Sequence, residues 1–269
     1  MTAHRSARQR MHAEREKQAR AARRRRHLVV GGVLAGVLVA GGAVALTVSA
    51  EDGDTSSSAA AADGPLVTPK NTTESGGSVV VYGNPSAKRT LDVYEDPRCP
   101  FCGIVERGLG STMQKLADEG KVKVRYHVAT FLDDATGGGG SKNALAAMGA
   151  ALDQGPKQFA AVHAALYEHQ PEESSDTFAD TSELLKLTAG VPGLDQAAFK
   201  KAVQDGTYLP WAKKAGKDNG RHLDDAWAKA KLPGRPGTPA VFLDGERLNV
   251  VASPQSAISP ADFTKLVTK

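Results

Sequence analysis

The chain has 269 residues, of which 41% are hydrophobic and 24% charged, and this composition is that of a globular protein. Its net charge of +4 is unevenly distributed. Residues 1–27 hold ten of the 34 Lys and Arg and two of the 30 Asp and Glu, a net charge of +8, which leaves −4 for residues 28–269. The main part of the chain therefore lacks the basic surface that nucleic-acid binding needs, and no nucleic-acid partner is expected.

A run of 21 uncharged residues, 28–48, follows the basic segment. At 1.5 Å per residue such a run spans a hydrocarbon core of roughly 30 Å, so we expect a single transmembrane helix, an uncleaved signal anchor. Basic residues precede it and acidic residues follow it, which predicts a cytoplasmic tail over 1–27 and a remainder outside the cell membrane. A signal peptide cleaved after Val48-Ser49-Ala50 is the alternative, and it places the remainder on the same side.

Residues 49–77 are rich in Ser, Ala, Gly, Asp and Thr. Such a segment buries too little apolar surface to fold by itself, so we expect a disordered linker that tethers the globular part near the membrane. The composition changes at residue 78, and residues 78–269 have the pattern of one folded domain.

The first part of this domain predicts strands over 79–82 and 90–95, a helix over 100–119 and a third strand over 122–128. One helix between two neighbouring strands indicates that these strands are parallel. The expected fold class is therefore α/β.

The rest of the domain is mainly helical until about residue 230. Helical patterns occupy 142–153, 156–169, 181–189, 195–204 and 208–229. A strand over 240–243, a turn at Asp244-Gly245, a return strand over 247–251 and a helix from Pro260 to about Thr268 complete the chain.

The chain has two cysteines, Cys99 and Cys102, where the second strand gives way to the first helix. Side chains at i and i+3 of a helical turn face the same way, so the two sulfurs can reach bonding distance. Pro100 suits the first helical position, which places Cys99 at the helix N-terminus. Free N–H groups there favour the thiolate, the attacking species in disulfide exchange, and Cys102 is expected to be the less exposed, resolving thiol.

Three other roles compete for such a pair. A structural disulfide closing so short a loop would constrain the unfolded chain little. A zinc site needs about four ligands, and the histidines are scattered, so no metal is expected. A c-type haem needs a histidine at position 103, which is Gly.

Two segments carry a family resemblance. Glu95-Asp96-Pro97-Arg98-Cys99-Pro100-Phe101-Cys102 resembles the active site of DsbA-like thiol–disulfide oxidoreductases of the membrane-anchored bacterial type, and Gly237-Thr238-Pro239 resembles their cis-proline loop. The resemblance covers about residues 78–269 and implies a thioredoxin-like fold with a helical insertion over about 141–230. It also implies that Cys99 attacks, that Cys102 resolves, and that Pro239 is cis and faces the sulfurs while the Thr238 backbone pairs with substrate.

Some positions depart from the family pattern. Many thioredoxin-like enzymes carry a buried acid six residues before the first cysteine, a position that is Val93 in this chain. Asp96 is the candidate for a proton or positioning role, or else a cap at the start of the helix. The dipeptide Pro100-Phe101 lacks the histidine of the most oxidising members, and Arg98 either supplies part of that positive charge or is solvated. The histidines are expected to be packed or at the surface, and Trp211 and Trp227 in the core of the insertion.

Together these features predict a single-pass membrane protein whose catalytic domain is an extracytoplasmic thiol–disulfide oxidoreductase. We expect an oxidase that donates the Cys99–Cys102 disulfide to reduced secreted or membrane proteins and is reoxidised by a membrane partner. No cofactor beyond this disulfide is expected. A reductase or isomerase of the same fold is one alternative, and a non-catalytic binding or scaffold protein with an inert disulfide is another.

Overall fold

The computed structural model of the protein describes residues 64–73 and 77–269. The expected tail over 1–27, the expected transmembrane helix over 28–48, and residues 49–63 and 74–76 of the expected linker lie outside the described residues. Within the described ranges, no helix combines the length and the apolar character that crossing a membrane requires.

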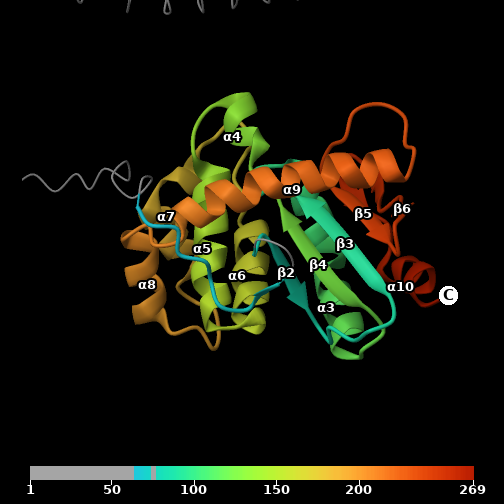
Figure 1. Ribbon diagram of the computed structural model, residues 1–269, viewed down its shortest axis with the longest axis horizontal. Helices are drawn as coiled ribbons and strands as arrows, with labels where there is room; N and C mark the ends of the chain where they lie inside the picture. The colour runs from blue at the N-terminus through green and yellow to red at the C-terminus, as the bar shows by residue number, and fades with distance from the viewer. Residues whose placement is uncertain (1–63, 74–76) are drawn as a thin grey trace, which may run out of the picture. The chain divides into compact units, whose positions relative to one another are not determined.

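A six-stranded mixed sheet carries the active-site segment (Figure 1). In spatial order its strands are β1 (Thr72–Thr73), β2 (Val79–Tyr82), β4 (Lys123–Val128), β3 (Thr90–Glu95), β5 (Ala240–Leu243) and β6 (Glu246–Leu248). β3 and β4 are parallel, as predicted, and the other neighbouring pairs are antiparallel. The α/β fold class is thereby confirmed for the described residues.

Successive side chains of β3 point to opposite faces of the sheet and enter two separate clusters. Leu91 and Val93 lie in the main core, which also contains residues of α2 (Pro100–Val105), α3 (Ser111–Asp118) and α10 (Pro260–Thr268). Tyr94 lies on the other face and packs with Phe242 of β5 and Leu223 of α9 (Leu209–Lys229). The sheet is thus covered on both faces, and β3 leads from this core into the turn before α2.

The predicted helix over 100–119 is interrupted in its middle. α2 ends at Val105, a π-helical turn spans Glu106–Gly110, and α3 begins at Ser111. The turn directs the carboxylate of Glu106 into the protein, where the residue is buried. Gly110 leaves room for it, because a Cβ at that position would lie 2.4 Å from Oε2 of Glu106.

The helical insertion follows β4. Its helices are α4 (Phe131–Thr136), α5 (Gly140–Gln154), α6 (Pro156–Glu168), the short 3-10 helix η3 (Thr177–Ala179), α7 (Thr181–Thr188), α8 (Gln196–Gln204) and α9. Five of them match the predicted segments closely, whereas α4 was not expected. α9 packs against both α5 and β4, so it joins the insertion to the sheet (Figure 1).

Residues 70–73, which belong to the predicted linker, contact the folded domain. Thr72 and Thr73 pair with β2, and the backbone N–H of Lys70 donates to the carboxylate of Asp153 at 2.9 Å. The Asn71 side chain donates to the carbonyl of Leu152 at 3.0 Å. Composition alone did not reveal these contacts, because the partners come from the folded domain.

The structure corrects two further expectations, the extent of the return strand after Gly245 and the burial of Trp227. The return strand ends at Leu248, and a separate two-stranded sheet follows, β7 (Val251–Ser253) with β8 (Ser256–Ala257). Trp211 is buried in the core as expected, but Trp227 is only half-buried and lies against the guanidinium group of Arg247. Gly245, with φ of 89°, completes the predicted turn between β5 and β6.

Candidate active site

The two cysteines lie at the start of α2, directly after the turn that follows β3. Cys99 is the N-cap residue and Pro100 occupies the first turn. Cys99 and Cys102 are both free thiols, and they differ in access to solvent, since Cys99 is 7% exposed and Cys102 is 1% exposed. Phe101, which lies between them in the sequence, is 42% exposed. A partner molecule would therefore meet Phe101 and Cys99 first.

The two thiols also differ in acidity. A hydrogen bond from the Cys102 thiol, helped by the backbone N–H groups of Phe101 and Cys102, lowers the pKa of Cys99 to about 7 although burial acts in the opposite direction. Burial, together with the charges of Cys99 and Glu95, raises the pKa of Cys102 well above its ordinary value. Near neutral pH the pair therefore holds a partly ionised Cys99 beside a protonated Cys102.

The loop before β5 lies against this pair. The Thr238–Pro239 peptide bond is cis, as the resemblance implied. The Cys99 thiol donates to the carbonyl oxygen of Thr238 at 3.3 Å. The loop reaches the sulfur because β5 runs antiparallel to β3, with Ala240 opposite Tyr94.

Asp96 fixes the turn before the cysteines. One carboxylate oxygen accepts the N–H of Arg98 at 3.0 Å and the hydroxyl of Ser141 at 2.6 Å, and the other accepts the N–H of Leu132 at 3.1 Å. Burial, with the charge of Asp133, raises the pKa of Asp96 to about 6 against the effect of these three bonds. The geometry is that of a positioning acceptor, which ties the turn to α4 and α5.

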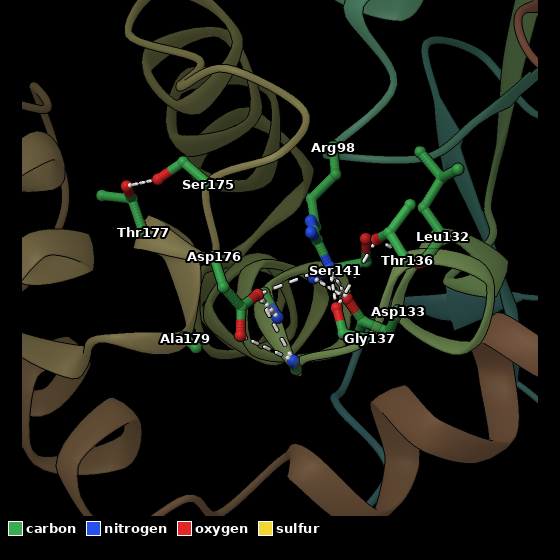
Figure 2. A network of polar contacts seen from close by, with 12 residues as sticks. Arg98, Leu132, Asp133, Thr136, Gly137, Ser141, Ser175, Asp176, Thr177 and Ala179 are labelled. Carbon is green, nitrogen blue, oxygen red and sulfur yellow. Dashed lines mark hydrogen bonds and ion pairs between the residues drawn. The ribbon is translucent and has the colours of Figure 1, made fainter. Parts of the chain in front are cut away.

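Arg98 is the centre of a buried network between the active-site turn and the insertion (Figure 2). Its side chain is 2% exposed, and Nη1 lies 3.1 Å from the carboxylate of Asp133 and 3.4 Å from that of Asp176. The guanidinium group also donates to the carbonyls of Gly137 at 2.8 Å and Glu173 at 3.0 Å. The interpretation of Arg98 as a solvated cation is therefore wrong, and its charge is matched by acids of the insertion rather than directed at a sulfur.

A buried cluster of ionisable groups next to this site was missed by the sequence reasoning. Nε2 of His163 on α6 lies 2.5 Å from Oε1 of Glu95, and Nδ1 lies 3.6 Å from Oε2 of Glu106. All three residues are buried. Burial lowers the pKa of His163, but the charges of the two carboxylates outweigh it and raise the pKa to about 9. Burial raises the pKa of Glu106 to about 7 despite the attraction of His163.

The alternation of β3 carried a signal for this cluster. Glu95 follows Leu91 and Val93 on the buried face, so the strand pattern already places a carboxylate in the core. No comparable local pattern identifies His163 as its partner, because the two residues are 68 positions apart.

In the described part of the chain, Glu95, Glu106 and His163 bring three potential metal-ligating atoms within 4.8 Å of one another. The distances between these atoms show whether they could bind a metal ion. Two ligands of one tetrahedral zinc ion, each about 2.1 Å from the metal, lie roughly 3.4 Å apart. The 2.5 Å separation of Nε2 and Oε1 is that of a direct hydrogen bond. The cluster therefore has the geometry of a hydrogen-bonded pair, Glu95 and His163, with the carboxylate of Glu106 as a second, more distant ion-pair partner of the imidazole.

Comparisons with known proteins support the observed architecture. The family model described as Thioredoxin matches residues 74–269. A reduced disulfide bond oxidoreductase (DsbG) from Mycobacterium tuberculosis is similar, with 26% identity, a TM-score of 0.50 and coverage of 75% of this chain and 84% of that chain. MdbA, a thiol-disulfide oxidoreductase from Actinomyces oris, has 25% identity and a TM-score of 0.55, over 74% of this chain and 88% of its own.

A curated relative is a larger protein of another kind. Serine/threonine-protein kinase PknE of Mycobacterium tuberculosis is 31% identical over 137 residues, which is 48% of this chain and 24% of that protein. The chain thus spans about a quarter of the length of the curated relatives it matches.

Proposed function

The chain belongs to the thioredoxin family and, within it, to the DsbA-like thiol–disulfide oxidoreductases, and from this membership we propose that it works as an oxidase. It donates the Cys99–Cys102 disulfide to reduced secreted or membrane proteins. The asymmetry of the pair supports disulfide exchange at Cys99, and the family membership supports its direction. Cys99 is the better exposed thiol, with a pKa of about 7, and Cys102 lies behind it, 1% exposed.

The proposed reaction moves two electrons from substrate to enzyme. A substrate thiolate attacks Sγ of Cys99, the bond between Cys99 and Cys102 breaks, and Cys102 leaves with the electron pair and takes up a proton. A second substrate thiolate then attacks the substrate sulfur of the mixed disulfide and releases the Cys99 thiolate. The substrate gains a disulfide, and the enzyme is left as the dithiol.

The remaining site residues have supporting roles in this proposal. Pro100 starts α2 without leaving a backbone donor unused, so the N–H groups that follow it serve the sulfur. Exposed Phe101 and the Thr238 backbone contact the substrate, which pairs as an added strand beside Pro239. Asp96 and Arg98 hold the turn that presents Cys99.

We also propose the cellular setting. The uncharged run over 28–48, with basic residues before it and acidic residues after it, supports a single span with the catalytic domain outside the cytoplasm. A membrane protein that accepts the two electrons and restores the Cys99–Cys102 disulfide is the expected partner. No bound cofactor takes part in the proposed cycle.

A reductase or isomerase is the second candidate, and one observation favours it. The pKa of the nucleophile in thiol–disulfide oxidoreductases falls as the disulfide becomes more oxidising, from about 7 in thioredoxin to about 3.5 in DsbA. The pKa of Cys99, about 7, lies at the reducing end of this range. The dipeptide Pro100-Phe101, without a histidine, agrees with that reading.

The reduction potential decides between these candidates. The full-length protein in detergent would be equilibrated with glutathione buffers, and the fraction of free Cys99 and Cys102 would be measured by thiol trapping. A potential above about −200 mV supports the oxidase, and one near about −270 mV supports the reductase. A value below about −300 mV would indicate an inert structural bridge and would contradict both.

A further inference from the structure

The segment between α6 and η3, residues 170–176, contacts three consecutive residues of the active-site turn. Nε2 of Gln170 donates to the carbonyl oxygens of Pro97 at 2.8 Å and Cys99 at 2.9 Å. Between them, Arg98 donates to the carbonyl of Glu173 and pairs with Asp176 of the same segment. The backbone that carries the nucleophile is therefore held by one stretch of the insertion.

Gly103 makes the contact of Gln170 with the turn possible. A Cβ at position 103 would lie 2.1 Å from Oε1 of Gln170 and 2.7 Å from Nη1 of Arg107, closer than atoms approach without moving. Gly103 lies inside α2, where Ala is a better helix former than Gly. The helical backbone therefore gives no reason for a glycine, and the close approach of the Gln170 amide does.

The contact acts on the peptide units that surround the sulfur. The carbonyl oxygen of Cys99, which accepts from Gln170, also accepts the N–H groups of Cys102 at 3.0 Å and Gly103 at 3.3 Å. This shared acceptor orients the first turn of α2 relative to Cys99. The donors on the carbonyls of Pro97 and Cys99 also offset the negative ends of two peptide dipoles near the thiolate.

We propose that Gln170 is a positioning residue of the active site, whose amide holds the Pro97–Cys99 turn in the geometry that makes Cys99 reactive. The proposal rests on the proposed function only in assigning disulfide exchange to Cys99, and it is independent of the direction of that exchange. The helical insertion thereby sets the reactivity of a cysteine that belongs to the thioredoxin-like part of the chain.

The first test is the pH profile of Cys99 alkylation in the reduced full-length protein. Gln170→Ala removes both hydrogen bonds, so labelling at pH 6.5 should slow about five- to tenfold and the midpoint of the profile should move to higher pH by up to about one pH unit. Gln170→Glu replaces the donor by an acceptor of the same shape and should slow labelling further. Gln158→Ala is the matched control, since its Nε2 donates at 3.1 Å to the Gly193 carbonyl elsewhere in the insertion.

The second test breaks the same contact from the other side. Gly103→Ala should displace Gln170 and give a similar shift, and the double variant with Gln170→Ala should shift little beyond the larger single effect. Gly220→Ala is the control, because a Cβ there meets nothing within 4 Å. Wild-type labelling profiles in both Gln170 variants, or additive effects in the double variant, would overturn the proposal. A wild-type protein that labels normally but exchanges no disulfide with a dithiol peptide would instead contradict the proposed function.

Discussion

The Cys99 thiol lies 3.3 Å from the carbonyl oxygen of Thr238, although 139 positions separate the two residues in the chain. The antiparallel register of β3 with β5 produces this contact, because it brings the start of β5 beside the end of β3. An extended substrate that pairs with the Thr238 backbone would bring its own sulfur to Cys99. Cys99 is thus the more exposed and more acidic thiol of the pair, and it is also the one beside the proposed substrate-pairing backbone.

Cys102→Ser should accumulate a mixed disulfide between Cys99 and a substrate thiol, because the resolving thiol is missing. Cys99→Ser should form none, since the remaining Cys102 is 1% exposed and its pKa is raised well above the ordinary value. Intact-mass analysis after incubation with a disulfide peptide and acid quenching measures both. An adduct on the Cys99→Ser protein would show that the roles of the two cysteines are reversed.

The alkylation rate of Cys99 in the wild-type protein should follow a titration with a midpoint near the pKa of about 7. The thiolate fraction is then about one tenth at pH 6 and about nine tenths at pH 8. Stopped-flow labelling with a neutral alkylating reagent gives the profile. A midpoint near 9, the value of an unperturbed thiol, would contradict the effect assigned to the Cys102 thiol and the N–H groups at the start of α2.

Arg98→Met should destabilise the protein by about 3–5 kcal/mol, because buried Asp133 then keeps only the more distant ammonium group of Lys142, 3.9 Å away, as its cation. Urea unfolding of the variant and the wild-type protein measures the loss. Lys201→Met is the control, since its pair with Asp205 is exposed and is expected to matter by less than about 1 kcal/mol. Equal losses in the two variants would mean that burial of the Arg98 network has no energetic consequence.

Glu106 predicts a pH dependence of stability. In the folded protein its pKa is raised to about 7, above the value of 4.5 in an unperturbed chain. The folded state therefore keeps a proton that the unfolded state has lost, so the contribution of Glu106 to stability is present below pH 4.5 and is lost as the pH rises through 7.

Glu106→Gln removes this titration. Relative to the wild-type protein, the variant should gain stability between pH 5 and pH 8, by on the order of 2 kcal/mol. Urea unfolding of both proteins at the two pH values gives the difference. A difference that is constant, or that changes in the opposite direction, would contradict the raised pKa.

The expected span over 28–48 predicts that the full-length protein stays with the membrane fraction after alkaline extraction. Deleting residues 28–48 should release the catalytic domain into the soluble fraction or prevent its export. Cell fractionation followed by N-terminal sequencing measures the outcome. A soluble wild-type protein that begins just after Ala50 would establish the alternative of a cleaved signal peptide.

Local patterns in the sequence predicted the parts of this protein that local interactions determine. The alternation of β4, the helical spacing over 142–229 and the turn at Asp244-Gly245 all appear close to their predicted positions. The spacing of Cys99 and Cys102 predicted a pair at a helix start, because two side chains one turn apart share a face whatever surrounds the helix.

Contacts between distant residues were decided only by the tertiary structure. Arg98 has its acids 35 and 78 positions away, Glu95 has His163 on α6, and Gln170 reaches the carbonyl of Cys99 from the segment that follows that helix. The alternation of β3 marks Glu95 as buried but does not identify its partner. Arg98 and Gln170 are ordinary in their own sequence neighbourhoods, so no local pattern shows that their side chains are bound inside the protein. Packing of the insertion against the active-site turn excludes water from these groups, and an excluded polar group must then find its partner within the protein.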